Sequence, residues 1–224
     1  AEPQKAAPAF ARAATRAGAR ILAACAVRGL ESSGGRVSAV VTEHGTIRTS
    51  TVLCAAGAWS SLFCRSLGIA LPQLKVRGTV VRTAPSAAPF EFNLFDSRLG
   101  MRHRQDGGYT IAHGAVLHHP LTPATFRWAF KFLPALKKEH KALRLSIGKA
   151  FFTEWQREKP WQLDQVSPFE TTRVLDPQPD AGVVAGIRRN LDTMIPQLAT
   201  TPIVESWAGG RGSEALVDAE AAAR

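Results

Sequence analysis

The 224-residue sequence predicts an α/β (α+β) fold divided into two regions. A helical pattern at residues 4–17 is followed by short apolar runs, which favours strands alternating with helices. Between residues 92 and 112 the pattern changes to short strands around Asp106-Gly107-Gly108, which is a hairpin signal. A Pro-, Ala- and Ser-rich stretch at residues 84–89 lies between the two patterns and is the best linker candidate.

The first region is predicted to begin with a helix over residues 4–17, which ends at Gly18. Residues 21–27 have the composition of a buried strand. Residues 36–42 are predicted to form a second strand, which pairs through the turn at 43–46 with Ile47 and with residues 52–55.

The centre of this region is the stretch from Thr51 to Ser60, where a short apolar run breaks at small residues and opens a helix. Ser60 is the N-cap candidate of that helix. Small residues such as Ala56 and Gly57 would let the main chain approach a ligand closely. The alternative is a plain strand-to-helix break, with Trp59 as a core aromatic residue.

The second region is predicted to follow a strand at residues 74–83 and to contain strands at 92–95, 100–104 and 109–112. Arg102 and Arg104 fall on one face by alternation, and we expect that face to be solvated. A helical arm should start at Thr122-Pro123, continue as one apolar stripe to Phe151 and end before Pro160.

The last part of the chain is predicted to return to the first region. Residues 167–180 are a Pro-punctuated loop in which Glu170 and Arg173 should form an ion pair. Strands are expected at residues 182–187 and 202–207, with a short helix at 191–198 between them.

The composition is that of a globular protein, with 45% hydrophobic and 21% charged residues and a net charge of +10. The basic residues of residues 1–84 stand singly, with little aromatic interleaving, so nucleic-acid binding is not predicted. The uncharged apolar run at residues 49–64 is too short for a spanning helix. Cys25, Cys54 and Cys64 form no Cys-x-x-Cys pair and indicate a reducing compartment, so we expect a cytoplasmic location.

His113, His118 and His119 are the candidate metal ligands by residue type. No Cys, Asp or Glu joins them at ligand spacing, so no metal site is predicted.

The order of these elements resembles a known family. The pattern of residues 35–42, the Ala-Ala-Gly-Ala-Trp-Ser of residues 55–60, Ser167-Pro168-Phe169-Glu170 and the segment 203–209 are similar to the FAD-dependent D-amino-acid oxidase family, which includes glycine oxidase, sarcosine oxidase and D-amino-acid dehydrogenase. The resemblance implies an incomplete FAD-binding Rossmann-like region, made of residues 1–84 and 182–224. It also implies an inserted antiparallel-sheet substrate domain with a helical arm, residues 85–181.

The resemblance also implies site residues. Val27, at the end of its strand, would contact the adenine ring, although a plain core strand is the alternative. Ala56, Gly57 and Trp59 would lie against the cofactor. Arg211 follows Trp207-Ala208-Gly209 after one residue, where glycine-oxidase-like members bind the substrate carboxylate with an arginine. An exposed arginine is the alternative for Arg211.

Residues 210–215 also match Gly-x-Gly-x-x-Ala formally, but no second strand or acidic ribose partner follows, so we interpret this match as coincidence. No Gly-x-Gly-x-x-Gly turn precedes Ile21, and we expect a chain truncated at both ends relative to the family.

The function implied is FAD-dependent oxidation of the C–N bond of an amino acid or N-substituted amine. The alternative is a non-catalytic fragment or subunit, whose flavin site a partner chain completes.

Overall fold

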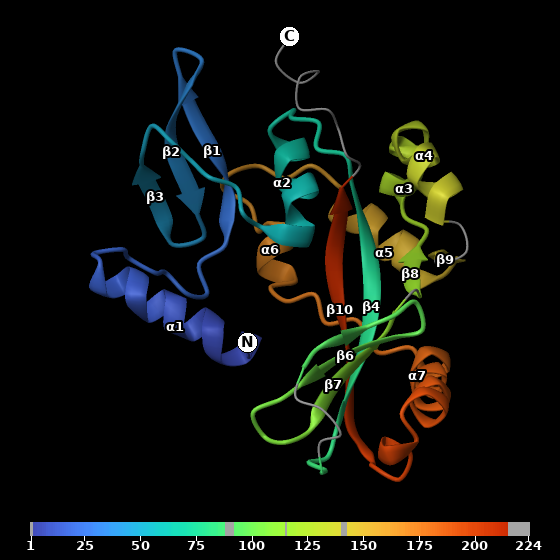
Figure 1. Cartoon of the computed structure of the whole chain (residues 1–224). Helices are drawn as coiled ribbons and strands as arrows, with labels where there is room; N and C mark the ends of the chain where they lie inside the picture. The colour runs from blue at the N-terminus through green and yellow to red at the C-terminus, as the bar shows by residue number, and fades with distance from the viewer. Residues whose placement is uncertain (1, 88–91, 115, 140–142, 215–224) are drawn as a thin grey trace.

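The computed structural model describes residues 2–87, 92–114, 116–139 and 143–214 of the chain. Two sheets organise it (Figure 1): a three-stranded antiparallel sheet near the N-terminus and a seven-stranded sheet that contains the middle and the end of the chain. The strands are β1 (Val27–Ser33), β2 (Arg36–Thr42), β3 (Gly45–Arg48), β4 (Gln73–Thr83), β5 (Leu94–Phe95), β6 (Leu99–His103), β7 (Tyr109–His113), β8 (Leu117–Pro120), β9 (Leu143–Ser146) and β10 (Ile203–Glu214).

The helices lie around these sheets. They are α1 (Pro3–Arg16), the 3₁₀ turn η1 (Gly57–Trp59), α2 (Ser60–Ser66), α3 (Pro123–Arg127), α4 (Ala129–Glu139), α5 (Lys149–Arg157), α6 (Pro168–Thr171), α7 (Ala181–Met194) and the 3₁₀ turn η2 (Pro196–Leu198).

The long antiparallel pair β4 and β10 runs through the middle of the molecule (Figure 1), from Ile203 opposite Thr83 to Glu214 opposite Gln73. The other edge of β4 pairs with β7 and β8, so the sheet order is β5-β6-β7-β4-β8-β9 with β10 on β4. The predicted strands at residues 74–83 and 202–207 are confirmed, and the second is longer than predicted. The strand β4, before residue 84, and the strands β5 to β9, after it, share one sheet. The domain boundary at residue 84 stays a prediction.

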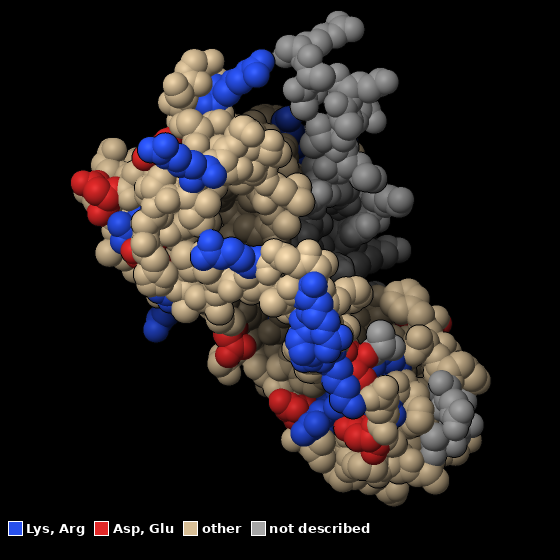
Figure 2. Space-filling view, turned by 90° about the vertical axis from the view of Figure 1, so that its left-hand side faces the viewer, with Lys and Arg blue, Asp and Glu red and all other residues tan. Residues whose placement is uncertain are grey.

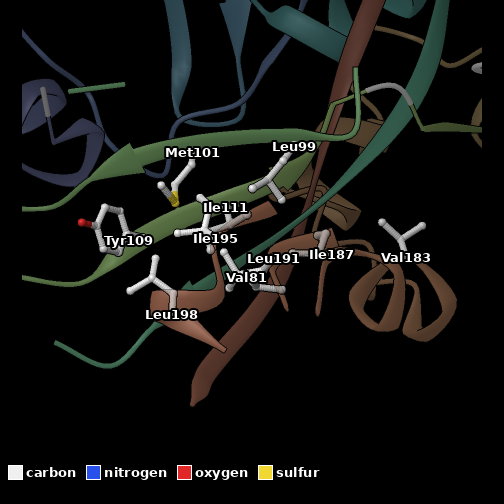
Figure 3. Close-up of a cluster of buried hydrophobic side chains, with 10 residues drawn as sticks. All are labelled: Val81, Leu99, Met101, Tyr109, Ile111, Val183, Ile187, Leu191, Ile195 and Leu198. Carbon is white, nitrogen blue, oxygen red and sulfur yellow. The ribbon is translucent and has the colours of Figure 1, made fainter. Parts of the chain in front are cut away.

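The buried core lies where α7 and η2 cover the sheet (Figure 3). Its members are Val81, Leu99, Met101, Tyr109, Ile111, Val183, Ile187, Leu191, Ile195 and Leu198. The predicted strand at residues 182–187 is wrong, because these residues form the first half of α7. Val183, Ile187 and Leu191 recur every four residues, which places them on one helical face. Asp180 caps the helix by accepting a hydrogen bond from the Val183 amide at 2.9 Å.

The predicted hairpin between β6 and β7 is confirmed, with His103 opposite Tyr109. Gly107 takes a φ of +81°, and Asp106 accepts a hydrogen bond from the Gly108 amide. The face expected to be solvated carries ion pairs instead of free arginines: Arg102 binds Glu2, and Arg104 binds Asp106.

At the N-terminal side, α1 and β2 are confirmed, and Gly18 ends α1 with a φ of +94°. The predicted strand at residues 21–27 is wrong. Ile21 and Leu22 are 54% and 51% exposed, and β1 begins at Val27, where the predicted strand ends. A short apolar run has no periodicity that fixes its register or burial. The predicted pairing of β2 with Ile47 is confirmed, since Ile47 of β3 lies opposite Val40. Residues 52–55, also expected to pair with β2, are not in a strand.

The helical arm starts as predicted. Thr122 and Thr125 form a reciprocal capping box ahead of Pro123. The single apolar stripe to Phe151 is wrong, because β9 separates α4 from α5 and pairs in parallel with β8.

Replacing Gly114 by Ala is expected to lower the free energy of unfolding by about 1–3 kcal/mol. An added Cβ there would lie 2.7 Å from the backbone carbon of Ser97 and closer still to the Asp96 carbonyl oxygen, so the backbone must shift. Chemical denaturation measures the change. Gly78→Ala is the matched control, because an added Cβ at Gly78 meets nothing within 4 Å. Equal losses for the two variants would contradict the assigned packing.

Candidate active site

A cavity of about 680 Å³ with a mostly apolar lining lies between the β1–β3 sheet and the η1 turn. We call it the apolar hollow. Its walls include the small residues Ala24, Cys25, Ala26, Ala55 and Ala56, together with Val27. Figure 2 shows the face that includes β1–β3, hollowed in its upper part between mostly uncharged residues. Small side chains leave room there for a flat group.

The η1 turn positions the aromatic wall of this hollow. Gly57 takes a φ of +55°, which a residue with a Cβ rarely adopts. Ser60 is the first residue of α2, and Trp59 holds the N-cap position without a side-chain cap, so the predicted cap is off by one residue. The break at Gly57 places Trp59 in the wall of the hollow.

Phe169 of α6 holds the aromatic side chains together. Its ring centroid lies 5.5 Å from that of Trp59, 5.5 Å from that of Trp161 and 6.0 Å from that of Phe63, each at a steep interplanar angle. Edge-to-face pairs of this kind each contribute about 0.5–1.5 kcal/mol beyond their burial. The α6 segment is therefore a structural part of the hollow.

Two ion pairs fasten the α6 segment to the small sheet. Arg28 of β1 donates two hydrogen bonds of 3.0 Å to the Glu170 carboxylate. Arg173 donates two, of 2.7 and 2.6 Å, to Glu43. The predicted ion pair between Glu170 and Arg173 is wrong, since each binds a partner far along the sequence. The Arg28 guanidinium lowers the pKa of Glu170 to about 2, and the Arg173 guanidinium lowers that of Glu43 to about 2.

A second cavity of about 480 Å³ lies between α5, β4 and the segment 172–177. We call it the cationic hollow, because Lys75, Arg77, Lys149 and Arg157 line it. Val174 lines both hollows, so the two are adjacent.

Trp59 and Lys75 stand between the two hollows. The Lys75 ammonium lies 4.5 Å from the centre of the Trp59 ring, and the Arg157 guanidinium lies 5.5 Å from it. Both cations bind one carboxylate, that of Glu154, at 2.7 and 2.6 Å. One acidic residue thus fixes two basic residues against one indole ring.

The histidines of β8 have structural contacts. His119 lies within 2.8 Å of the Lys75 carbonyl oxygen and 2.9 Å of the Thr125 hydroxyl. Burial lowers the pKa of His118 and of His119. Among the residues that the structure describes, no group of three potential ligands could hold a metal ion.

The structure brings three of the predicted cofactor residues together: Val27, Ala56 and Trp59 line the apolar hollow. Gly57 follows Ala56 directly in η1. The backbone of Arg211 lies in β10 opposite Val76, next to Gly210 of the cationic hollow. The side chain of Arg211 lies outside what the structure describes. Residues 210–214 continue β10, so they do not form a phosphate-binding turn.

Sequence reasoning missed Lys75, Glu154 and Arg157. Lys75 and Glu154 are 79 positions apart, and no local pattern connects them. The sequence marks Phe169 and Glu170 as part of a family segment, but it predicts no role for Phe169 and the wrong ion-pair partner for Glu170.

Charged side chains on the face in Figure 2 are mixed in sign in its lower part, with acidic residues beside basic ones. Several basic residues have acidic partners in the described chain, among them Arg82 with Glu205 and Arg65 with Glu158. Part of the positive charge is therefore balanced locally. No helix in the described residues has the length and apolar character needed to cross a membrane.

An apolar hollow beside a cationic one has room for a flat apolar group next to an anionic group. Comparison with known proteins identifies the family. The family model described as "DAO: FAD dependent oxidoreductase" matches residues 1–221, and the chain belongs to this family of FAD-dependent oxidoreductases.

Among curated relatives, the D-amino acid dehydrogenase of Rhizobium rhizogenes is 32% identical over 128 residues, covering 50% of this chain and 30% of that protein. The glycine oxidase of Pseudomonas aeruginosa is 46% identical over 55 residues, covering 25% of this chain and 15% of that protein. The structure is similar to L-amino acid deaminase from Proteus myxofaciens in complex with anthranilate, with a TM-score of 0.87 and 31% identity over 93% of this chain and 47% of that one. The chain thus spans less than half the length of these relatives.

The residues present fit the ring systems of FAD. The apolar hollow combines small residues with the aromatic side chains of Trp59, Phe63 and Phe169. Arg173 is the basic residue among its described lining, and Glu43 already occupies its guanidinium. The apolar hollow therefore suits flat aromatic rings better than a pyrophosphate.

Proposed function

We propose that the chain takes part in FAD-dependent oxidation of the C–N bond of an amino acid or N-substituted amine, giving an imine. The observation that carries the proposal is the adjacency of the apolar and cationic hollows, which share Val174 and meet at Trp59 and Lys75. Family membership supports it.

Bound FAD would supply the redox chemistry, by accepting two electrons from the carbon beside the substrate nitrogen. Val27, Ala56, Gly57 and Trp59 would contact it, as their positions in or beside the apolar hollow suggest. Trp59 would offer the cofactor an aromatic surface, and the apolar wall would exclude water from the ring.

The cationic hollow would bind the substrate carboxylate. Lys75 and Arg157 already share one carboxylate, so the Glu154 cluster keeps one positive charge in excess. We propose that Arg211 adds a guanidinium to this site, since its neighbour Gly210 lines the hollow. The relatives named as acting on amino acids support this substrate class.

Two further points belong to the proposal. A partner chain would complete the flavin site. The cysteine pattern supports a cytoplasmic location.

The deciding experiment is a visible absorption spectrum. The chain is purified with added FAD, free cofactor is removed, and amino acids are added without oxygen. We expect retained oxidised flavin that bleaches with substrate. A folded but colourless protein would contradict flavin binding by this chain alone.

The Trp59→Ala variant is expected to retain at least tenfold less flavin, because it loses the aromatic wall and releases Lys75 and Arg157 from the indole ring. The flavin-to-protein absorbance ratio measures this. Trp155→Ala is the matched control: Trp155 is 57% exposed on α5 and should leave flavin retention unchanged. A similar loss in both variants would argue against the placement of the cofactor.

A further inference from the structure

The net positive charge of the cationic hollow is larger than a single carboxylate would neutralise. Its lining holds four basic residues, Lys75, Arg77, Lys149 and Arg157, and two acidic ones, Glu154 and Asp176. With His118 neutral, the lining carries a net charge of +2. Asp180 lies just outside and binds Arg77 at 3.3 Å, which still leaves a positive excess. An amino acid with a neutral side chain would place one carboxylate against this charge.

The positive charge stands at two separate places. Lys149 begins α5 and Arg157 ends it, so their backbones lie about 12 Å apart along the helix axis. Arg157 belongs to the Glu154 cluster, while Lys149 has no ion-pair partner among the described residues. The hollow therefore has one basic pole at the Glu154 cluster and a second at Lys149.

Part of the lining of the cationic hollow is apolar. Val76, Ala150 and Leu175 line the same cavity, whose volume is about 480 Å³. Arg77 lies along β4 with its guanidinium 3.1 Å from His118 Nδ1. Arginine only donates hydrogen bonds, so His118 accepts at Nδ1 and carries its proton on Nε2, which is buried and has no hydrogen-bond partner. An anionic ligand in the hollow would offer acceptors to the Lys149 ammonium.

Resting on the function proposed above, we infer that the substrate is a dicarboxylic amino acid, whose two carboxylates occupy the two basic poles and whose methylene groups lie against the apolar wall. A substrate with a basic side chain would be repelled by the positive charge of Lys149. A substrate with an amide in place of the second carboxylate would lose a charge-assisted hydrogen bond.

The binding test compares succinate with succinamate, which has the same shape but one carboxylate. Isothermal titration calorimetry of the whole chain is expected to give at least tenfold tighter binding of succinate, with an affinity that falls as salt rises. Lys149→Gln should remove most of this preference. Lys159→Gln is the matched control, since Lys159 is exposed and does not line the hollow, and it should leave the preference intact. Equal binding of the two ligands, or equal effects of the two variants, would overturn the inference.

A second measurement separates this inference from the proposed function. In protein that has retained FAD, glutamate at limiting concentration should reduce the flavin at least tenfold faster than glutamine at the same concentration. The Lys149→Gln variant should bring the two reduction rates closer together. Equal rates would leave the proposed C–N oxidation standing and overturn the dicarboxylate inference. If no flavin is retained, the proposed function fails for this chain, and calorimetry still decides whether the hollow prefers two carboxylates.

Discussion

Replacing Leu191 by Ala is expected to lower the free energy of unfolding by about 2–5 kcal/mol. Leu191 is fully buried where α7 meets the sheet, in contact with the cluster that includes Val81 and Ile111 (Figure 3). Alanine is the best helix former, so the loss would come from apolar contacts and the cavity left behind rather than from helix propensity.

Urea denaturation followed by circular dichroism measures this change. Leu133→Ala is the control, because it makes the same substitution in a helix at a residue that is 43% exposed, and its cost should be below about 1 kcal/mol. If the two variants lost similar stability, α7 would not cover the core as described.

The same helix shows what the sequence could and could not predict. The apolar run at Val76 and residues 79–81 predicted β4, in which buried residues alternate with less buried ones along most of the strand. In α7 the pair Val183-Val184 favours a strand by composition, while the four-residue spacing of Val183, Ile187 and Leu191 favours a helix. The spacing and the Asp180 cap decide the outcome.

For the candidate site, sequence reasoning found the residues that a local pattern marks. Ala56, Gly57 and Trp59 adjoin a break in one short stretch, and the structure places them in or beside one hollow. The long-range ion pairs were not predictable, because Arg28 with Glu170 and Glu43 with Arg173 join positions 142 and 130 residues apart. The error of pairing Glu170 with Arg173 came from preferring the nearest opposite charge, whereas the fold supplies bidentate partners on β1 and after β2.

These two ion pairs predict an acid-sensitive attachment of α6. Lowering the pH from 4.5 to about 2 is expected to destabilise the protein steeply, with a contribution from Glu43 and Glu170. The arginine partners lower the pKa of each carboxyl from 4.5 to about 2 in the folded state. A carboxyl with a lowered folded-state pKa stabilises the fold above its unfolded pKa, and this contribution is lost as the pH falls through the window between 4.5 and about 2.

The measurement is the midpoint of urea denaturation at a series of pH values between 2 and 7, compared between the native chain and the double variant Glu43→Gln/Glu170→Gln. The double variant should be less stable at pH 7, and its midpoint should fall less steeply with acid, since it lacks both titrating groups. Glu31→Gln on β1 is the control, because Glu31 is exposed and forms no ion pair in the described chain. Parallel pH profiles for the native chain and the double variant would contradict the prediction.

Acid should also open the apolar hollow, because Phe169, Arg173 and Val174 are part of its lining. These three residues belong to α6 and the residues after it, which the two ion pairs hold against β1 and the turn after β2. Trp161 donates a hydrogen bond of 2.8 Å to the Arg28 carbonyl oxygen and packs against Phe169, so its fluorescence should shift to longer wavelength as the segment detaches. In chain that has retained FAD, release of the flavin should follow the same pH window. Release without a tryptophan shift would place the acid-sensitive contact elsewhere in the cofactor site.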